Sequence, residues 1–223
     1  MNVLVACEES QRVCIAFREK GHNAFSCDIQ EPSGGYPEFH IQGDVLPLLN
    51  GNCTFKTMTG DLITIDRQWD LIIAHPPCTY LSAAGSTNLL NADHSIKNIE
   101  RYQKGIEAKK FFESVLSADC KRLCVENPAP LKLFNLPPYS QIIQPFMFGD
   151  PWVKRTCLWL KGLPILFSCD LVQPVSCWVE CHGKGSRTVL RGAKGAHTAK
   201  DRSKTFPGIA KAMAEQWGIL SYE

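Results

Sequence analysis

One stretch of the chain, Asp70-Leu-Ile-Ile-Ala-His75-Pro76-Pro77-Cys78, constrains the fold more than any other. Four consecutive apolar residues followed by two prolines predict a buried strand that ends at a rigid turn. Cys78 then stands at the carboxyl end of that strand, and ligands of open α/β sheets bind beyond the carboxyl ends of the strands. The thiol of Cys78 is therefore a candidate nucleophile.

Strand-like and helix-like patterns alternate along the chain. Apolar runs predict strands over 2–6, 23–27, 69–74, 123–125 and 155–160, with a further short segment that starts at Gly43. Helical spacing of apolar residues predicts helices over 11–20, 95–118 and 209–217. This alternation predicts an α/β fold with a mostly parallel sheet and helices on both faces. With 223 residues, no internal repeat and no linker, we expect one domain over 1–223.

Composition indicates the compartment. The chain opens without a basic leader, and no apolar run approaches the ~20 residues that span a bilayer. Its 11 cysteines are an odd number scattered over the predicted elements, which favours reduced thiols over a disulfide framework. We therefore expect a cytoplasmic protein without a membrane partner.

Charge is distributed unevenly. Residues 1–70 carry ten acidic and five basic residues, a net charge of −5. Because the whole chain carries +2, residues 71–223 carry +7. Seven bases and one acid fall within 183–204, a glycine-rich segment that we expect to be a mobile loop. Such a segment is either a solvated surface loop or an arm that contacts nucleic-acid phosphates.

Three predicted strands end in reactive or acidic side chains, at Asp28, Cys78 and Glu126. A carboxylate after the second strand commonly binds a ribose in nucleotide-binding folds. The glycine-rich loop that wraps a pyrophosphate is missing, because Ala6-Cys7-Glu8-Glu9-Ser10 follows the first strand instead. A nucleoside cofactor without phosphates, such as S-adenosylmethionine, therefore fits better than a dinucleotide.

With these features the chain resembles the DNA cytosine-5 methyltransferases, and most closely a compact branch commonly found among phage and prophage sequences. The resemblance covers nearly the whole chain as short motifs in the family's order. They are Val3 to Phe17, Asp28, Gly43-Asp44-Val45, His75-Pro-Pro-Cys78, Val125-Glu126-Asn127-Pro128 and Ser203-Lys-Thr-Phe-Pro207.

The resemblance implies a Rossmann-like methyltransferase fold, S-adenosylmethionine as cofactor and DNA as partner. It also implies methyl transfer to C5 of cytosine, with Cys78 attacking C6 and Glu126 at the N3/N4 edge of the base. The residues it places at the cofactor are Ala6, Cys7, Glu8, Asp28, Ile29, Asp44, Val45, His75, Pro76 and Phe206. Those it places at the substrate are Pro77, Asn127, Lys154, Arg187 and Arg191.

Two departures from the family's pattern affect the substrate side. The family supplies an arginine to the target base from a Gln-x-Arg-x-Arg segment, and Thr156 stands here where the second arginine belongs. Arg155, after a one-residue shift, is the candidate catalytic replacement, and Lys154 is the alternative. Fewer than 50 residues separate Thr156 from Ser203, so a separate target-recognition domain is missing and we expect short or lax sequence specificity.

Other functions stay open. The same thiol chemistry works on RNA cytosine, and a catalytically weak nucleic-acid-binding protein could keep the fold. An amino-group methyltransferase is disfavoured because Cys78 replaces the aromatic residue expected after the two prolines. Four candidate zinc ligands lack the paired Cys-x2-Cys spacing, so we expect no metal; they are Cys169, Cys177, Cys181 and His182.

Overall fold

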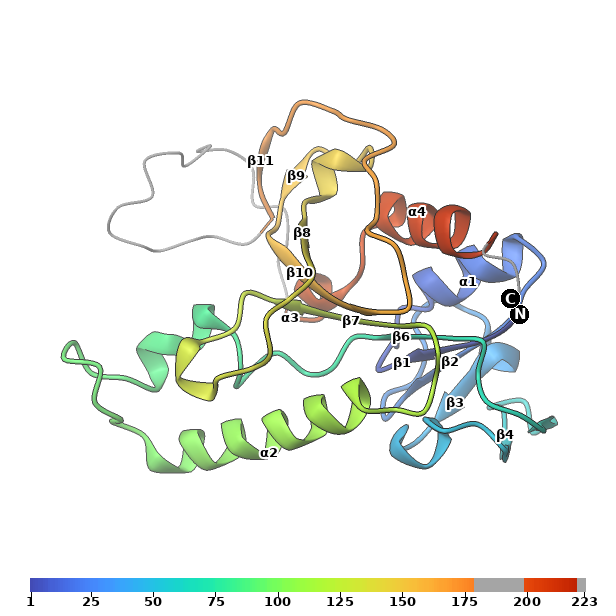
Figure 1. Ribbon diagram of the computed structural model, residues 1–223, viewed down its shortest axis with the longest axis horizontal. Coiled ribbons are helices and arrows are strands. Elements are labelled where there is room, and N and C mark those ends of the chain that lie inside the picture. The colour runs from blue at the N-terminus through green and yellow to red at the C-terminus, as the bar shows by residue number, and fades with distance from the viewer. Residues whose placement is uncertain (179–198, 220–223) are drawn as a thin grey trace.

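The computed structural model describes residues 1–178 and 199–219 (Figure 1). The fold is a mixed, Rossmann-like α/β structure built on a seven-stranded sheet in the order β3-β2-β1-β6-β7-β10-β8. The strands are β1 (Asn2–Ala6), β2 (Asn23–Asp28), β3 (His40–Gln42), β6 (Leu71–Ala74), β7 (Leu123–Pro128), β8 (Gln141–Ile143) and β10 (Thr156–Lys161).

Five neighbouring strands of this sheet, from β3 to β7, run parallel, whereas β10 runs antiparallel to both β7 and β8. The parallel strands follow the doubly wound order 3-2-1-4-5 when they are counted along the chain. That order reverses between β1 and β6. The carboxyl ends of these two strands therefore flank the place where doubly wound sheets bind their ligands.

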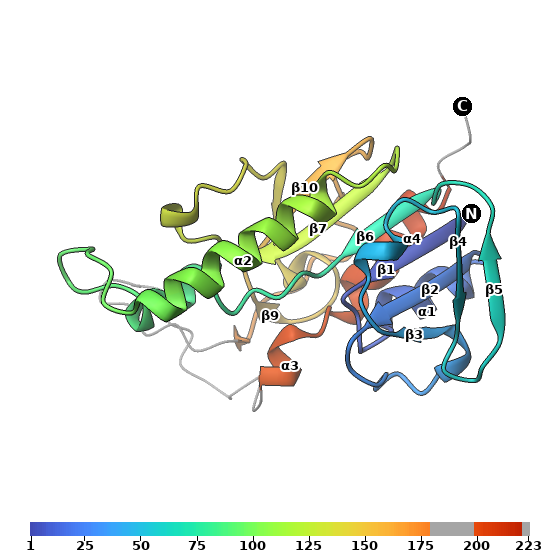
Figure 2. The same ribbon diagram turned by 90° about the horizontal axis from the view of Figure 1, so that it is seen from below.

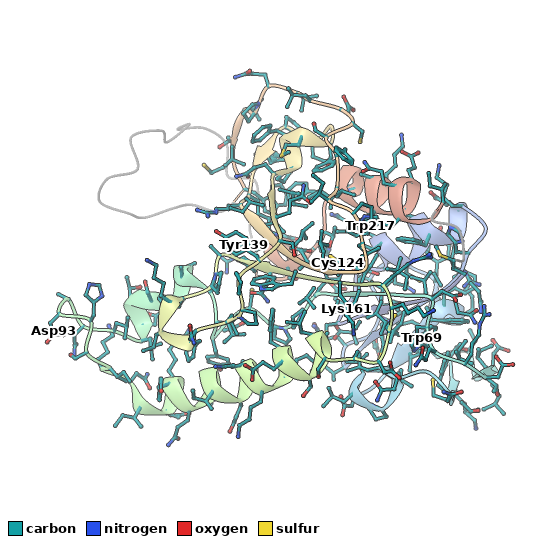
Figure 3. The ribbon with its side chains drawn as sticks, viewed as in Figure 1. Trp69, Asp93, Cys124, Tyr139, Lys161 and Trp217 are labelled. Atoms are coloured by element: carbon teal, nitrogen blue, oxygen red, sulfur yellow. The ribbon has the colours of Figure 1, made fainter. Side chains whose placement is uncertain are left out.

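Helices cover both faces of the sheet, as the alternating pattern predicts. Helices α1 (Arg12–Glu19) and α4 (Pro207–Trp217) pack against one face and α2 (Ile99–Leu116) against the other, as Figures 1 and 2 show. Alternate residues of β1 point to opposite faces, so Val3 joins one core and Leu4 the other. Two buried tryptophans mark the two cores, Trp217 beside α1 and Trp69 on the α2 side (Figure 3).

Smaller elements complete the described structure, and the sequence analysis predicts none of them. A hairpin joins β4 (Cys53–Lys56) to β5 (Leu62–Ile65), and β9 (Trp152–Val153) pairs with β11 (Ser176–Cys177). The short helices are η1 (Pro37–Phe39), η2 (Leu46–Leu48), η3 (Ala83–Asn88), η4 (Lys132–Phe134), η5 (Pro145–Met147) and α3 (Ala199–Ser203).

The structure corrects three boundaries. The predicted strand over 123–125 continues to Pro128, because β10 pairs with it from Thr156 opposite Pro128 to Lys161 opposite Leu123. The segment that starts at Gly43 is the loop after β3 rather than a new element. Of the basic segment predicted as a loop, residues 199–203 form α3, and 183–198 lie outside the described residues.

Within the described ranges no helix combines the length and the apolar character needed to cross a bilayer.

Gly208, at the start of α4, lies against the chain that precedes β9. Its N–H donates to Asp150 Oδ2 at 2.8 Å, and a Cβ at this position would overlap the carbonyl oxygen of Phe148. Alanine ordinarily favours a helix by ~1 kcal/mol over glycine. Here the overlap with backbone reverses the sign, so we expect Gly208→Ala to lower the free energy of unfolding by about 1–3 kcal/mol.

Urea unfolding measures this effect. Gly43→Ala is the matched control, because a Cβ on Gly43 meets no atom within 4 Å. The control is expected to stay within about 0.5 kcal/mol of the wild type. A Gly208→Ala protein as stable as the wild type would contradict this packing.

Candidate active site

Cys78 lies on a tight turn just beyond the point where the sheet order reverses. The His75 N–H donates to the carbonyl oxygen of Ala6 at 2.9 Å, which continues the β1–β6 pairing by one residue. The two prolines then end the strand. The carbonyl oxygen of Cys78 accepts hydrogen bonds from the N–H groups of Leu81 and Ser82, at 3.2 and 3.0 Å, so the turn fixes the backbone of a half-buried thiol.

A buried histidine–glutamate pair lies beside this turn. Ala74 of β6 is opposite Val125 of β7, which brings the next residues of both strands together. His75 Nδ1 and Glu126 Oε2 are 2.7 Å apart, and their side chains are 10% and 9% exposed. The Thr205 hydroxyl donates to the same carboxylate oxygen at 3.3 Å.

The two side chains shift each other's pKa values. Burial raises the pKa of Glu126, but the hydrogen bond and charge of His75 outweigh burial and leave that pKa below its ordinary value. Burial lowers the pKa of His75, but Glu126 outweighs burial and leaves that pKa raised. Both shifts favour a protonated imidazole beside an ionised carboxylate, across a contact of 2.7 Å.

Two buried polar atoms near the turn lack a hydrogen-bond partner among the described residues. One is Nε2 of His75, and the other is Oδ1 of Asn127. Asn127 uses its Nδ2 to donate to the carbonyl oxygen of Pro76 at 3.0 Å, which ties β7 to the turn. Unsatisfied buried polar atoms are rare in proteins, and they are expected where a ligand binds.

Lys154 has the largest effect on the Cys78 thiol among the positive charges at this site, and Arg202 adds to it. Burial raises the pKa of the Cys78 thiol, and Lys154 opposes that effect while Glu126 adds to it. The same lysine lowers the pKa of Glu126. Its Nζ lies 5.9 Å from the ring centroid of Phe206, which is buried against Trp178.

Arg155, the predicted catalytic arginine, lies elsewhere. Its Nη2 donates to the hydroxyl of Tyr139 at 3.2 Å. Its charge opposes the rise that burial causes in the pKa of Cys157, whereas Lys154 and Glu126 are the charges that act most strongly on Cys78. The structure thus brings Lys154, and not its neighbour, to the thiol.

The side chain of Glu8, in the turn after β1, caps the N-terminus of helix α1. Glu8 is buried, and its Oε1 and Oε2 accept hydrogen bonds from the N–H groups of Val13 and Cys14 at 2.7 and 3.1 Å. Burial raises the pKa of Glu8 to about 7, while the charge of His75 lowers it. The N-terminus of the first helix is where dinucleotide-binding folds hold a pyrophosphate, and here a side chain already occupies it.

Cys7, at the start of this turn, has φ 58°. This left-handed conformation is strained for a residue with a Cβ, and such strain concentrates at functional sites. Burial and the charges of Asp28 and Asp44 raise the pKa of Cys7 far above its ordinary value. The two predicted cofactor acids thus gather near the carboxyl ends of β1 and β2.

The other predicted residues fall in three groups. Ala6, Val45 and Pro76 are buried, so mainly their backbone is available to a ligand, whereas Pro77 is exposed and Ile29 is 76% exposed. Arg187, Arg191, Cys181 and His182 lie outside the described residues. No group of three or more metal-ligating side chains occurs within the part of the chain that is described.

Three features escape the sequence analysis: the pairing of His75 with Glu126, the capping role of Glu8, and Thr205. Only Thr205 had a signal, since it lies within the 203–207 motif. A separate surface hollow of about 510 Å³ lies at the opposite end of β6, lined partly by Trp69, Asp70 and Arg122, and does not adjoin Cys78.

No protein-family model matches the sequence, and no curated protein matches it. Among solved structures, a proposed DNA modification methyltransferase encoded within an E. coli prophage is similar, with a TM-score of 0.43 and 16% sequence identity. The similarity covers 78% of this chain and 52% of that protein, so the chain spans about half the length of its neighbour. We infer neither activity nor substrate from a similarity at this level.

The contribution of Lys154 to the thiol can be measured directly. Lys154→Met removes the cation with the largest effect on the Cys78 thiol, which raises the pKa of the thiol further. We expect the rate of iodoacetamide labelling at Cys78, followed by peptide mass spectrometry at pH 8, to fall about 3- to 10-fold.

Arg155→Met is the matched control, because it removes a neighbouring cation that contacts Tyr139 instead. Its labelling rate at Cys78 is expected to equal that of the wild type. Equal effects of the two substitutions would contradict the assignment of Lys154 to the site.

Proposed function

We propose that this protein is an S-adenosylmethionine-dependent methyltransferase that methylates C5 of cytosine in DNA through a covalent bond between Cys78 and C6. The observation that carries the proposal is the grouping of a thiol, a carboxyl group and a cation at the carboxyl edge of the sheet. Cys78, Glu126 and Lys154 come from three separate segments, and their charges act on one another.

The residues near the cofactor position suit a nucleoside without phosphates. Glu8 occupies the helix terminus where a pyrophosphate would otherwise bind, and its oxygens already accept hydrogen bonds from the N–H groups that a phosphate would use. Asp28 and Asp44 offer carboxylates to hydroxyl and amino groups, and Ile29 offers apolar surface to an adenine ring. When bound, S-adenosylmethionine supplies an electrophilic methyl group.

Cys78 is the nucleophile in this proposal. Its thiolate forms a bond to C6 of cytosine, and the electrons of the C5–C6 double bond become available at C5. Lys154 favours the thiolate over the thiol. After C5 has gained the methyl group, solvent water takes up the C5 proton. The electron pair of the C5–H bond re-forms the C5–C6 double bond, and the Cys78 thiolate leaves.

Glu126 acts at the N3/N4 edge of the base. A carboxyl group there accepts a hydrogen bond from the exocyclic amine and donates a proton toward N3 as negative charge develops on the ring. Asn127 holds the turn that carries Cys78 next to the strand that carries Glu126. In a duplex, the target cytosine must leave the base stack to reach both groups.

DNA is the proposed partner because the chain after residue 70 carries +7, and we retain Arg187 and Arg191 as proposed phosphate contacts. RNA cytosine is the alternative substrate, since neither the thiol nor the carboxyl group distinguishes the two sugars. The experiment below reads both nucleic acids.

Expression in a bacterial host that lacks DNA methylation tests the reaction. We expect nucleoside mass spectrometry to find 5-methylcytosine in DNA from cells with the wild type and at least 100-fold less with Cys78→Ala, because the adduct cannot form. Cys53→Ala, which changes a half-buried cysteine in the β4–β5 hairpin, is the control and should keep full activity. Methylated cytosine in RNA alone would replace DNA as substrate, and full activity of Cys78→Ala would refute the mechanism.

Calorimetry tests the cofactor position without requiring turnover. Asp28→Ala should weaken binding of S-adenosylmethionine about 10-fold or more, because a charge-assisted hydrogen bond contributes about 1.5–3 kcal/mol. Asp66→Ala, in an exposed turn after β5, should bind as the wild type does. Unchanged affinity in Asp28→Ala, or tight binding of NAD, would contradict the proposed cofactor site.

A further inference from the structure

The proposed chemistry asks Glu126 for a proton that the ligand-free protein does not hold on that carboxyl group. Attack of Cys78 on C6 moves electron density toward N3, so a donor must face N3 as the C6–S bond forms. A carboxylate alone cannot donate. The ion pair with His75 keeps Glu126 in its carboxylate form.

The missing proton lies one hydrogen bond away. His75 Nδ1 is 2.7 Å from Glu126 Oε2, and both side chains are nearly buried. The Thr205 hydroxyl approaches the same pair from a third segment, at 3.3 Å from Oε2 and 3.5 Å from Nδ1. Thr205 is itself fixed, since its carbonyl oxygen accepts a hydrogen bond from Arg12 of α1 at 2.7 Å.

We propose that His75 is a positioning residue that acts through Glu126, and that the imidazole and the carboxyl group work as one acid with one shared proton. This inference rests on the proposed function of Glu126 and goes beyond the resemblance, which places His75 at the cofactor.

The proton shared by His75 and Glu126 is conserved over the cycle. As cytosine docks, the Nδ1–H bond of His75 breaks and an O–H bond forms on Glu126, which leaves a neutral imidazole. As the C6–S bond forms, that proton bonds to N3 and takes up the electron pair displaced onto the ring. On β-elimination the C5 proton passes to solvent water, and the N3 proton returns to Glu126 and then to His75. The pair therefore begins and ends each cycle with one proton.

The surroundings of His75 favour a charged imidazole before the substrate binds. The charged groups that act on it are Glu126 of β7, Glu8 of the β1–α1 turn, and Lys154 between β9 and β10. Two carboxyl groups oppose one ammonium group and the cost of burial. When cytosine binds, His75 therefore holds the proton that Glu126 needs in order to donate to N3.

His75→Gln separates proton transfer from packing. Glutamine can still donate a hydrogen bond to Glu126, but its amide has no transferable proton at neutral pH. We expect kcat for methyl transfer to a cytosine-containing duplex to fall about 100-fold, within the range for lost acid–base catalysis. The KM for DNA, the affinity for S-adenosylmethionine and the unfolding temperature should stay close to those of the wild type.

The pH dependence of kcat distinguishes proton transfer through His75 from a purely structural role of His75. The folded pKa of His75 is raised above 6.5, so the shared proton is present below that pKa and is lost as the pH rises through it. Wild-type kcat should therefore fall on the alkaline side. His75→Gln should lack this falling limb and keep only the rise that follows ionisation of Cys78. A wild-type rate, or an unchanged falling limb, in His75→Gln would overturn the inference.

Nuclear magnetic resonance titration of the ligand-free protein covers the case in which His75→Gln does not fold. The His75 imidazole should titrate above its ordinary pKa in the wild type and at lower pH in Glu126→Gln. If the wild type transfers methyl groups but His75 titrates at the same pH in the wild type and in Glu126→Gln, this inference alone is overturned. A wild type that transfers no methyl group overturns the proposed function and, with it, this inference.

Discussion

The contact between His75 and Glu126 is the interaction on which the rest of the site depends. It joins the carboxyl ends of β6 and β7, and Thr205 and Arg12 extend it to the segment before α4 and to α1. A buried ion pair is a weak source of stability, because desolvation offsets most of the attraction. Its presence at a strand end next to a thiol is therefore better explained by chemistry than by folding.

The turn after β1 shows how one side chain can change the ligand class of a widespread fold. Rossmann-like sheets place a helix N-terminus where a phosphate can bind, and Glu8 fills that terminus with the chain's own carboxylate. The Glu8 side chain accepts hydrogen bonds from the N–H groups at the start of helix α1, as a pyrophosphate does in dinucleotide-binding folds. Charge near β1 and β2 then comes from Asp28 and Asp44, which suit hydroxyl and amino groups rather than anions.

Local sequence patterns predict the strand ends that carry chemistry, and long-range pairing decides the rest. Apolar runs followed by polar residues or prolines locate Asp28, Cys78 and the start of β7, because strand burial and proline geometry act over a few residues. The His75–Glu126 contact depends on how two strands 51 residues apart are paired. Lys154 and Arg155 are neighbours just before β10, and their side chains reach different surroundings. A one-residue shift in the register of β10 would exchange their positions.

The central claim is that the Cys78 thiolate adds to C6 of cytosine, and a duplex with 5-fluorocytosine tests it most directly. Fluorine replaces the C5 proton whose loss permits elimination, so a complex that has added sulfur and gained the methyl group cannot break down. With S-adenosylmethionine present, we predict a denaturation-resistant protein–DNA complex whose cross-linked peptide contains Cys78. No trapped complex from a protein that binds both ligands, or a cross-link at another cysteine, would contradict the account.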